Sequence, residues 1–191
     1  MVSLDVPSGL RFTPEQFAQL AAANRERRLE LTATGELIVM PPTGGDTGER
    51  NLDIEGQLWW WNQQRRLGKA YNSSTGFRLP QGAVRSPDAS WVSLPRWQAL
   101  SPEARRGFLP LCPDFAVELL SESDTLPQTQ AKMQEYLDNG LQLGWLIDPQ
   151  TQTVGIYRPG RSPEQLTAPA TLSGEPLLPG FVLDLRAVWS V

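Results

Sequence analysis

Three ionisable residues have types and positions that could form a hydrolytic site. Asp88 follows Pro87 at the start of the apolar segment Ala-Ser-Trp-Val, and Glu118 stands within Phe-Ala-Val-Glu-Leu-Leu. Burying a carboxylate in such a strand costs several kcal/mol unless it is paired or bound to a metal. Lys132 follows Glu118 within an expected helix, and Tyr136 lies one turn further along on the same face. The sequence therefore predicts two buried acids with a lysine nearby.

The absence of histidine narrows the chemistry that this site could perform. It excludes Ser-His-Asp and Cys-His catalysis, HExxH zinc sites and nucleases with a histidine general base. Carboxylates, lysines and tyrosines remain, and oxygen ligands favour a hard ion such as Mg²⁺ or Mn²⁺. Cys112 is the only cysteine, and we expect it to be a buried apolar residue because no histidine can activate it.

A series of short motifs gives these residues a wider context. The motifs are Pro-Asp-Phe-Ala-Val-Glu-Leu-Leu-Ser from Pro113, Lys-Met-Gln-Glu-Tyr from Lys132, Gly-Trp-Leu-Ile-Asp-Pro from Gly144, Ile-Tyr-Arg from Ile156, and Ser-Gly-Glu-Pro-Leu-Leu-Pro-Gly-Phe from Ser173. In this order they resemble the Uma2 family of the PD-(D/E)xK nuclease-like superfamily, over residues 13–189. The usual superfamily lysine stands two residues after the second acid, where this chain has Leu120. In Uma2 the lysine is taken to lie on the following helix, which matches Lys132.

The resemblance implies a metal-dependent endonuclease that hydrolyses DNA phosphodiester bonds. Asp88, Glu118 and Lys132 would be its catalytic residues. Asp88 and Glu118 would hold Mg²⁺ or Mn²⁺ together with the backbone carbonyl of Leu119, because such ions prefer oxygen ligands. Lys132 would orient the attacking water or stabilise the developing charge.

Four further residues are candidates for the same site. Glu49 or Asp53 could supply the acid that many nucleases of this superfamily carry on their first core helix. Many Uma2 members carry a histidine near the start of that helix, where this chain has Asn51. Asp114 and Tyr136 are the other two candidates, although Asp114 also suits a strand cap.

Two other functions stay open beside the endonuclease. The first is a catalytically incomplete nuclease-like fold that serves as a binding or regulatory module. The second is an enzyme acting on another phosphodiester or nucleotide, which the formal net charge of −4 makes a reasonable alternative to DNA.

Local patterns predict the helices and strands of an α/β fold that position these residues, and the resemblance implies a restriction-endonuclease-like mixed central sheet flanked by helices. An N-terminal helix with Thr13 as its N-cap and Pro14 in its first turn precedes a hairpin that turns at Gly35. The remaining expected elements are a helix over 51–67 ended by Gly68, a strand over 85–92, a short helix over 101–107, a central strand over 114–120, a helix over 127–139, a hairpin of 144–148 with 153–157, a loop over 158–170 and a strand over 181–185.

The length of the chain and its content of hydrophobic and charged residues fit one domain over residues 1–191. The first residues lack the basic and apolar regions of a secretory signal, no apolar run reaches the ~20 residues that span a bilayer, and the lone thiol suits a reducing cytoplasm. Trp59, Trp60 and Trp61 are consecutive, so they cannot all face one direction on a helix. We expect two of them in the core and at least one at a partner surface or under a loop, and we predict a homodimer.

Overall fold

The computed structural model describes residues 9–190, so the expectation about a secretory signal concerns residues outside the described part of the chain. In the first half the elements are α1 (Pro14–Ala23), β1 (Arg28–Leu31), β2 (Leu37–Met40), α2 (Gly45–Arg65), β3 (Gly68–Asn72), β4 (Phe77–Arg78), β5 (Val84–Arg85), β6 (Ala89–Ser93) and α3 (Leu94–Gln98). In the second half they are β7 (Phe115–Leu119), α4 (Leu126–Asp138), β8 (Leu143–Asp148), β9 (Thr153–Tyr157), β10 (Glu164–Thr167), β11 (Thr171–Ser173), β12 (Val182–Asp184) and α5 (Arg186–Ser190). No helix among residues 9–190 is both long and apolar enough to cross a bilayer.

The central sheet has six strands in the order β10-β9-β8-β7-β6-β3. β7 and β8 are parallel, while every other neighbouring pair in this sheet is antiparallel. The prediction of a mixed central sheet is therefore confirmed. β7 is an inner strand and every one of its residues is buried, as expected for a segment that is apolar on both faces.

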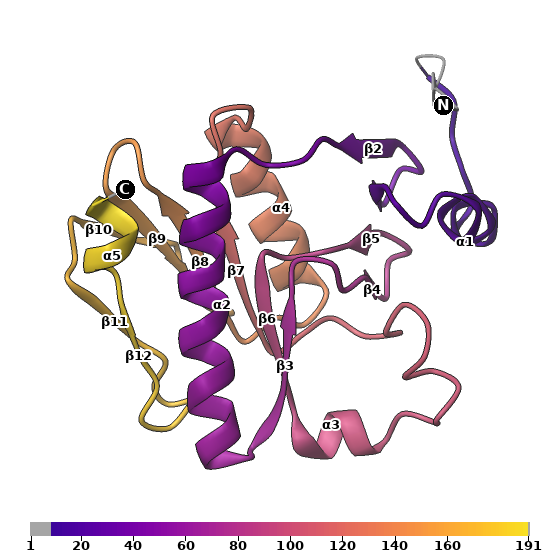
Figure 1. Ribbon diagram of the computed structural model, residues 1–191. Coiled ribbons are helices and arrows are strands. Elements are labelled where there is room, and N and C mark those ends of the chain that lie inside the picture. The colour runs from indigo at the N-terminus through magenta and orange to yellow at the C-terminus, as the bar shows by residue number, and fades with distance from the viewer. Residues whose placement is uncertain (1–8, 191) are drawn as a thin grey trace.

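Alternate residues of β7 belong to different cores. Phe115, Val117 and Leu119 join a cluster with residues of α2, α5, β11 and β12, whereas Ala116 faces a second cluster that includes Met133 and Tyr136 of α4. Figure 1 shows α2 in front of the sheet and α4 behind it. Because side chains alternate along a strand, Glu118 must point to the same side as Ala116, toward α4.

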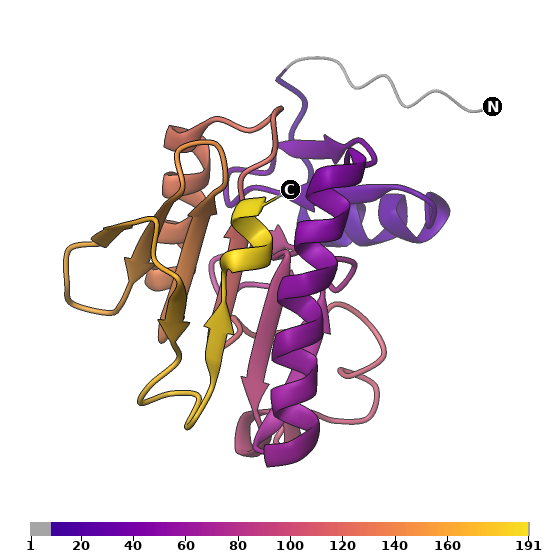
Figure 2. The same ribbon diagram turned by 60° about the vertical axis from the view of Figure 1, so that its left-hand side comes forward.

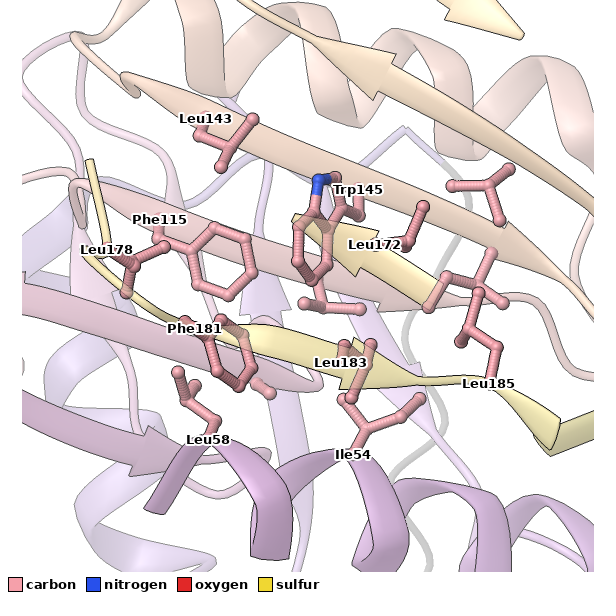
Figure 3. Packing of buried hydrophobic residues seen from close by; sticks show 14 of the residues in the cluster. Ile54, Leu58, Phe115, Leu143, Trp145, Leu172, Leu178, Phe181, Leu183 and Leu185 are labelled. Atoms are coloured by element: carbon pink, nitrogen blue, oxygen red, sulfur yellow. The ribbon is translucent and has the colours of Figure 1, made fainter. Parts of the chain in front are cut away.

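Aromatic packing fixes the α2 side of the sheet. Trp145 of β8 stacks on Phe181, with ring centroids 5.9 Å apart, and Phe115 meets Trp145 edge to face at 4.8 Å. Figure 3 shows these rings beside Leu58 of α2 and Leu183 of β12. Aromatic pairs of this kind add to the burial energy of their surfaces, so the face of β7 opposite Glu118 is firmly held.

A second, smaller sheet carries the N-terminal segment in the order β2-β1-β5-β4. The predicted helix start and hairpin are confirmed: Thr13 and Gln16 form a capping box, and β1 pairs antiparallel with β2. Gly35 has φ 83° in the connecting turn, a conformation that suits glycine. β5 continues directly toward β6, so the small sheet lies against the end of the central sheet where Asp88 precedes β6.

Two expected boundaries of the long helix were wrong. α2 begins at Gly45, before the expected Asn51, because the intervening polar residues continue the helix on its exposed side. The helix ends at Arg65, and its C-cap residue, Arg66, adopts a left-handed conformation with φ 55°. Gly68 instead starts β3, where a Cβ would lie 2.2 Å from the Val92 carbonyl oxygen. The glycine is needed for this close approach rather than for a helix cap.

Three other expectations were also wrong. The segment 101–107 forms turns rather than a helix, and the short helix in this region is α3. The strand expected over 85–92 is divided into β5 and β6, since Pro87 has no N–H for a ladder. The expected loop over 158–170 contains β10, which pairs with β9 at the sheet edge.

The tryptophan prediction needs a correction as well. Only Trp61 of the three consecutive tryptophans is buried, whereas Trp59 and Trp60 are exposed. Trp61 packs on Trp91 and Phe181 with the core side of α2. Successive residues of a helix are rotated by about 100° around its axis. One of three consecutive tryptophans can therefore point from α2 into the core while the other two point away from it.

Candidate active site

Strand pairing brings Asp88 and Glu118 to one edge of the central sheet. β6 runs antiparallel to β7 with Ala89 opposite Val117, so the residue that precedes β6 faces the end of β7. Asp88 Oδ2 accepts the backbone N–H of Leu119 at 2.9 Å. Glu118 is 6% exposed and projects toward α4. The structure thus brings together the two acids that the sequence had singled out.

α4 places Lys132 and Tyr136 against the same carboxylate. Lys132 Nζ lies 2.9 Å from Glu118 Oε1, and the Tyr136 hydroxyl donates a hydrogen bond to that oxygen at 2.8 Å. Residues four apart share one face of a helix, so α4 presents both groups to the end of β7. Lys132 therefore points into the site and not into solvent.

Glu30 of β1 completes the network, and sequence reasoning missed it. Its side chain is 2% exposed and lies 3.0 Å from Lys132 Nζ. It also accepts hydrogen bonds from Arg85 Nη1 at 3.0 Å and from the Ser86 backbone N–H at 2.8 Å. Arg85 in turn contacts Glu135 of α4, with Nε and Oε2 2.5 Å apart. An acid between Leu29 and Leu31 in an expected strand is the signal that could have found it, since a carboxylate buried in a strand needs a partner.

Burial sets the electrostatics of the two acids. Loss of solvent raises the pKa of the Glu118 carboxyl to about 7, even though the Lys132 ammonium acts in the opposite direction, and the neighbouring Asp88 and Glu30 raise it further. Burial also raises the pKa of Asp88, and the hydrogen bond from the Leu119 amide partly opposes this effect. A positive charge held between the two carboxylates would therefore stabilise their ionised forms and lower the pKa of both.

Lys132 keeps its charge inside this buried network. Burial alone would lower the pKa of its ammonium, but attraction to Glu118 and Glu30 outweighs burial and raises that pKa. The same balance acts on Glu30, where Lys132 and Arg85 overcome burial and lower the pKa of the carboxyl. Lys132 is thus a fixed cation and a hydrogen-bond donor, and it is a poor base.

These groups line an open cavity of about 1550 Å³. Arg28 lies at its wall with Nη2 3.8 Å from Asp88 Oδ1. Asn51 of α2 also lines the cavity, and its buried Oδ1 has no hydrogen-bond partner in the described part of the chain, residues 9–190. A buried polar atom without a partner is unusual and marks a place where a ligand or water could bind.

The donors at this edge fit a hard divalent ion. Asp88 and Glu118 supply carboxylate oxygens, and Asn51 supplies an amide oxygen that has no hydrogen-bond partner among residues 9–190. Among residues 9–190, no group of three or more His, Cys, Asp or Glu side chains has the arrangement of a metal site. Mg²⁺ commonly binds through one or two carboxylates and completes its shell with water or phosphate oxygens, so this donor set suits it.

The other candidate residues lie away from this edge. Asp53 accepts a hydrogen bond from Gln57 within α2, and with Glu49 it lines a different cavity on the outer side of that helix. Asp114 stands at the opposite end of β7 from Glu118, where it accepts from the Ser93 N–H and pairs with Arg96 at 2.7 Å. Its contacts are those of a strand cap. Of the additional candidates, only Tyr136 contacts the acids.

Comparisons with known proteins give the family and the fold of the chain. The family model of Uma2, described as "Putative restriction endonuclease", matches residues 14–186. The crystal structure of a protein from Anabaena variabilis ATCC 29413, described as a putative nuclease belonging to DUF820, has the same fold with a TM-score of 0.78. It is 22% identical in sequence, and the match covers 94% of this chain and 98% of that one. No curated protein is significantly similar to the chain.

Proposed function

Because the chain belongs to the Uma2 family, we propose that it is a metal-dependent endonuclease that hydrolyses DNA phosphodiester bonds. The observation that carries the proposal is the contact between Lys132 Nζ and Glu118 Oε1 at 2.9 Å, beside Asp88 on the adjacent strand. Two acids from neighbouring strands and a charged lysine from the next helix are the groups that such a hydrolysis needs.

Asp88 and Glu118 would hold Mg²⁺ or Mn²⁺, with the Leu119 backbone carbonyl as a third oxygen ligand. When bound, the ion lowers the pKa of a coordinated water and offsets charge on the phosphoryl oxygens. The Tyr136 hydroxyl donates to Glu118, which favours the ionised form of that carboxyl. The Leu119 amide does the same for Asp88.

Lys132 acts on the substrate as a cation. Its raised pKa keeps the ammonium protonated, so Nζ can donate a hydrogen bond to a phosphoryl oxygen or orient the attacking water. Glu30 holds the ammonium in place from the side opposite Glu118. A fixed donor in a buried site stabilises developing negative charge more strongly than one in water.

DNA is the proposed substrate because the cavity is open and has cationic groups at its wall. Arg28 is part-buried beside Asp88, and Arg50 also lines the cavity. Neutralising phosphates with such cations makes binding sensitive to salt. The net charge of −4 argues for local contacts rather than a broad basic surface.

The experiment is a cleavage assay on plasmid and single-stranded DNA with Mg²⁺ or Mn²⁺, run beside Glu118→Gln. The proposal expects metal-dependent cleavage by the native protein and loss of cleavage in the variant. Glu26→Gln, which replaces an exposed acid that does not line the cavity, is the matched control and should cut normally. Equal cleavage by both variants, or cleavage in excess chelator, would reject the proposal.

A metal-free binding module is the second candidate, and one observation favours it. Lys132 pairs with Glu118, Arg85 with Glu30 and Arg28 with Asp88, so each of these acids already has a cationic partner without an ion. If this candidate is correct, DNA binds with the same affinity in chelator and in Mg²⁺, and nothing is cleaved. Salt-dependent affinity for a duplex then distinguishes DNA from a small nucleotide ligand.

The rest of the proposal concerns the setting of the protein. It comprises one domain over residues 1–191, a location in the cytoplasm and assembly as a homodimer. The lone buried Cys112 supports the reducing compartment, because burial raises the pKa of its thiol to about 12 and makes it unreactive. The exposed Trp59 and Trp60 support assembly.

A further inference from the structure

Arg85 joins two acids that come from different parts of the chain. It stands at the end of β5, and its side chain is only 8% exposed. Its Nη1 donates to Glu30 Oε2 of β1 at 3.0 Å, and its Nε donates to Glu135 Oε2 of α4 at 2.5 Å. Because the guanidinium group is planar and rigid, these two contacts fix the position of Glu30 relative to α4.

The contacts of Arg85 belong to a ring that begins and ends on α4. Lys132 Nζ lies 3.0 Å from Glu30 Oε1, and Glu30 is joined to Glu135 through the guanidinium. Glu135 is three residues after Lys132, so both side chains lie on one flank of the helix. The Ser86 backbone N–H also donates to Glu30 Oε1 at 2.8 Å. Both oxygens of Glu30 are therefore engaged, which suits this acid to fixing the ammonium rather than to binding an ion.

Lys132 needs such an anchor because its side chain is long and flexible. Its ammonium is attracted by Glu118 and Asp88 as well as by Glu30. In the structure it contacts Oε1 of Glu118, the same oxygen that accepts from the Tyr136 hydroxyl. If Glu30 moved away, the remaining attraction would draw the ammonium into the space between the other two acids. The lysine would then occupy the place proposed above for the metal ion.

We propose that Arg85 is a positioning residue for the hydrolysis proposed above. By tying Glu30 to α4, it holds the Lys132 ammonium at the edge of the metal site. The inference rests on the proposed function only where it says that this position matters for cleavage. The position itself can be measured without metal or DNA.

The proposal gives the small N-terminal sheet a role in the active site. Figures 1 and 2 both show the N-terminal elements, drawn in indigo, on the opposite side of the molecule from β9 and β10. Strands β1 and β5 pair at Leu31 and Val84, which are the sequence neighbours of Glu30 and Arg85. This pairing therefore sets the distance between the acid and the guanidinium that anchor the lysine.

The test uses the fact that the chain has only two lysines, Lys69 and Lys132. NMR of the full-length protein made with ¹⁵N-labelled lysine, in chelator and without DNA, distinguishes the two ammonium groups once Lys69→Arg has assigned them. The Lys132 side chain is 15% exposed and paired on two sides, so its N–H protons should exchange slowly with water. Arg85→Gln should shift and broaden this signal and leave that of Lys69, which lies 4.6 Å from the Trp97 ring centroid, unchanged.

Two more variants make the result decisive. Arg85→Gln removes one partner of a buried ion pair, so circular dichroism and thermal unfolding check that it folds. Glu135→Gln is the second variant, because it frees the guanidinium from α4 at a side chain that is 16% exposed. It should alter the Lys132 signal in the same way. Arg96→Gln, which breaks the ion pair with Asp114 at the other end of β7, is the control and should leave both lysine signals as in the native protein.

Cleavage kinetics then connect the position of the ammonium to catalysis. Misplacing Lys132 should lower kcat by about 10- to 100-fold, while KM for DNA stays nearly unchanged because both contacts of Arg85 are to acids of the protein. An unchanged Lys132 signal in folded Arg85→Gln, or in Glu135→Gln if Arg85→Gln does not fold, would overturn the proposal, and so would an unchanged kcat. The expected lysine signals in a native protein that cleaves no DNA would reject the proposed function alone.

Discussion

Glu118→Gln should remove a pH dependence of stability that the native, metal-free protein shows near neutrality. The Glu118 carboxyl has a pKa of about 7 in the folded protein and an ordinary value of 4.5. A carboxyl with a raised pKa binds its proton more tightly in the folded state, so its stabilising contribution is present below pH 4.5 and is lost as the pH rises through 7. Each pH unit in this interval corresponds to about 1.4 kcal/mol, so the whole loss is on the order of 3 kcal/mol.

The measurement is urea unfolding followed by tryptophan fluorescence, in chelator, at pH 5 and pH 8. The chain has no histidine, so few other groups titrate in this window, and the raised pKa of Asp88 acts in the same direction. The native protein should be less stable at pH 8, and Glu118→Gln should lose most of that difference. Glu26→Gln, at an exposed acid, should keep it. An unchanged pH dependence in Glu118→Gln would refute the reasoning about its burial.

Three further results follow from the structure. Lys132→Ala should abolish cleavage while calorimetry shows nearly intact Mn²⁺ binding, because the ammonium contacts the acids but is not a ligand; a large loss of metal affinity would contradict this role. Tyr136→Phe removes a donor to Glu118 and should raise the pKa of that carboxyl, moving the acidic limb of the pH–rate profile to higher pH; an unmoved limb would count against it. Gly68→Ala should lower the free energy of unfolding by about 1–3 kcal/mol, since its Cβ would lie 2.2 Å from the Val92 carbonyl oxygen, and an unchanged melting temperature would show that the strands can move apart.

The sequence was informative where local chemistry decides the structure. The N-cap at Thr13, the turn at Gly35 and the apolar strand around Glu118 all have the predicted form. These features depend on side-chain preferences and spacing that can be read over a few residues. The expected positions of Asp88 and Lys132 beside Glu118 came instead from the resemblance to the Uma2 family, because these residues are distant in the sequence.

The features that the sequence did not predict correctly depend on contacts between segments that are distant in sequence. Glu30 was not predicted to be a site residue, because its contact with Lys132 depends on the pairing of β1 with β5. Gly68 looked like a helix end, but its role depends on how closely β3 approaches β6. Asp114 follows a proline, as Asp88 does, and it stands in the same expected strand as Glu118. The direction of β7 shows that Asp114 lies at the opposite end of this strand from Glu118. No local pattern encodes these relations.

The most direct test of the central claim is the position of Mn²⁺ in crystals of the protein, measured by anomalous scattering. We predict one strong peak between the Asp88 and Glu118 carboxylates, at 2.0–2.6 Å from an oxygen of each, the range for hard divalent cations. Lys132 Nζ should remain nearby without coordinating the ion. A peak at Asp53 or Asp114 instead, or none between the two acids at saturating Mn²⁺, would contradict the claim.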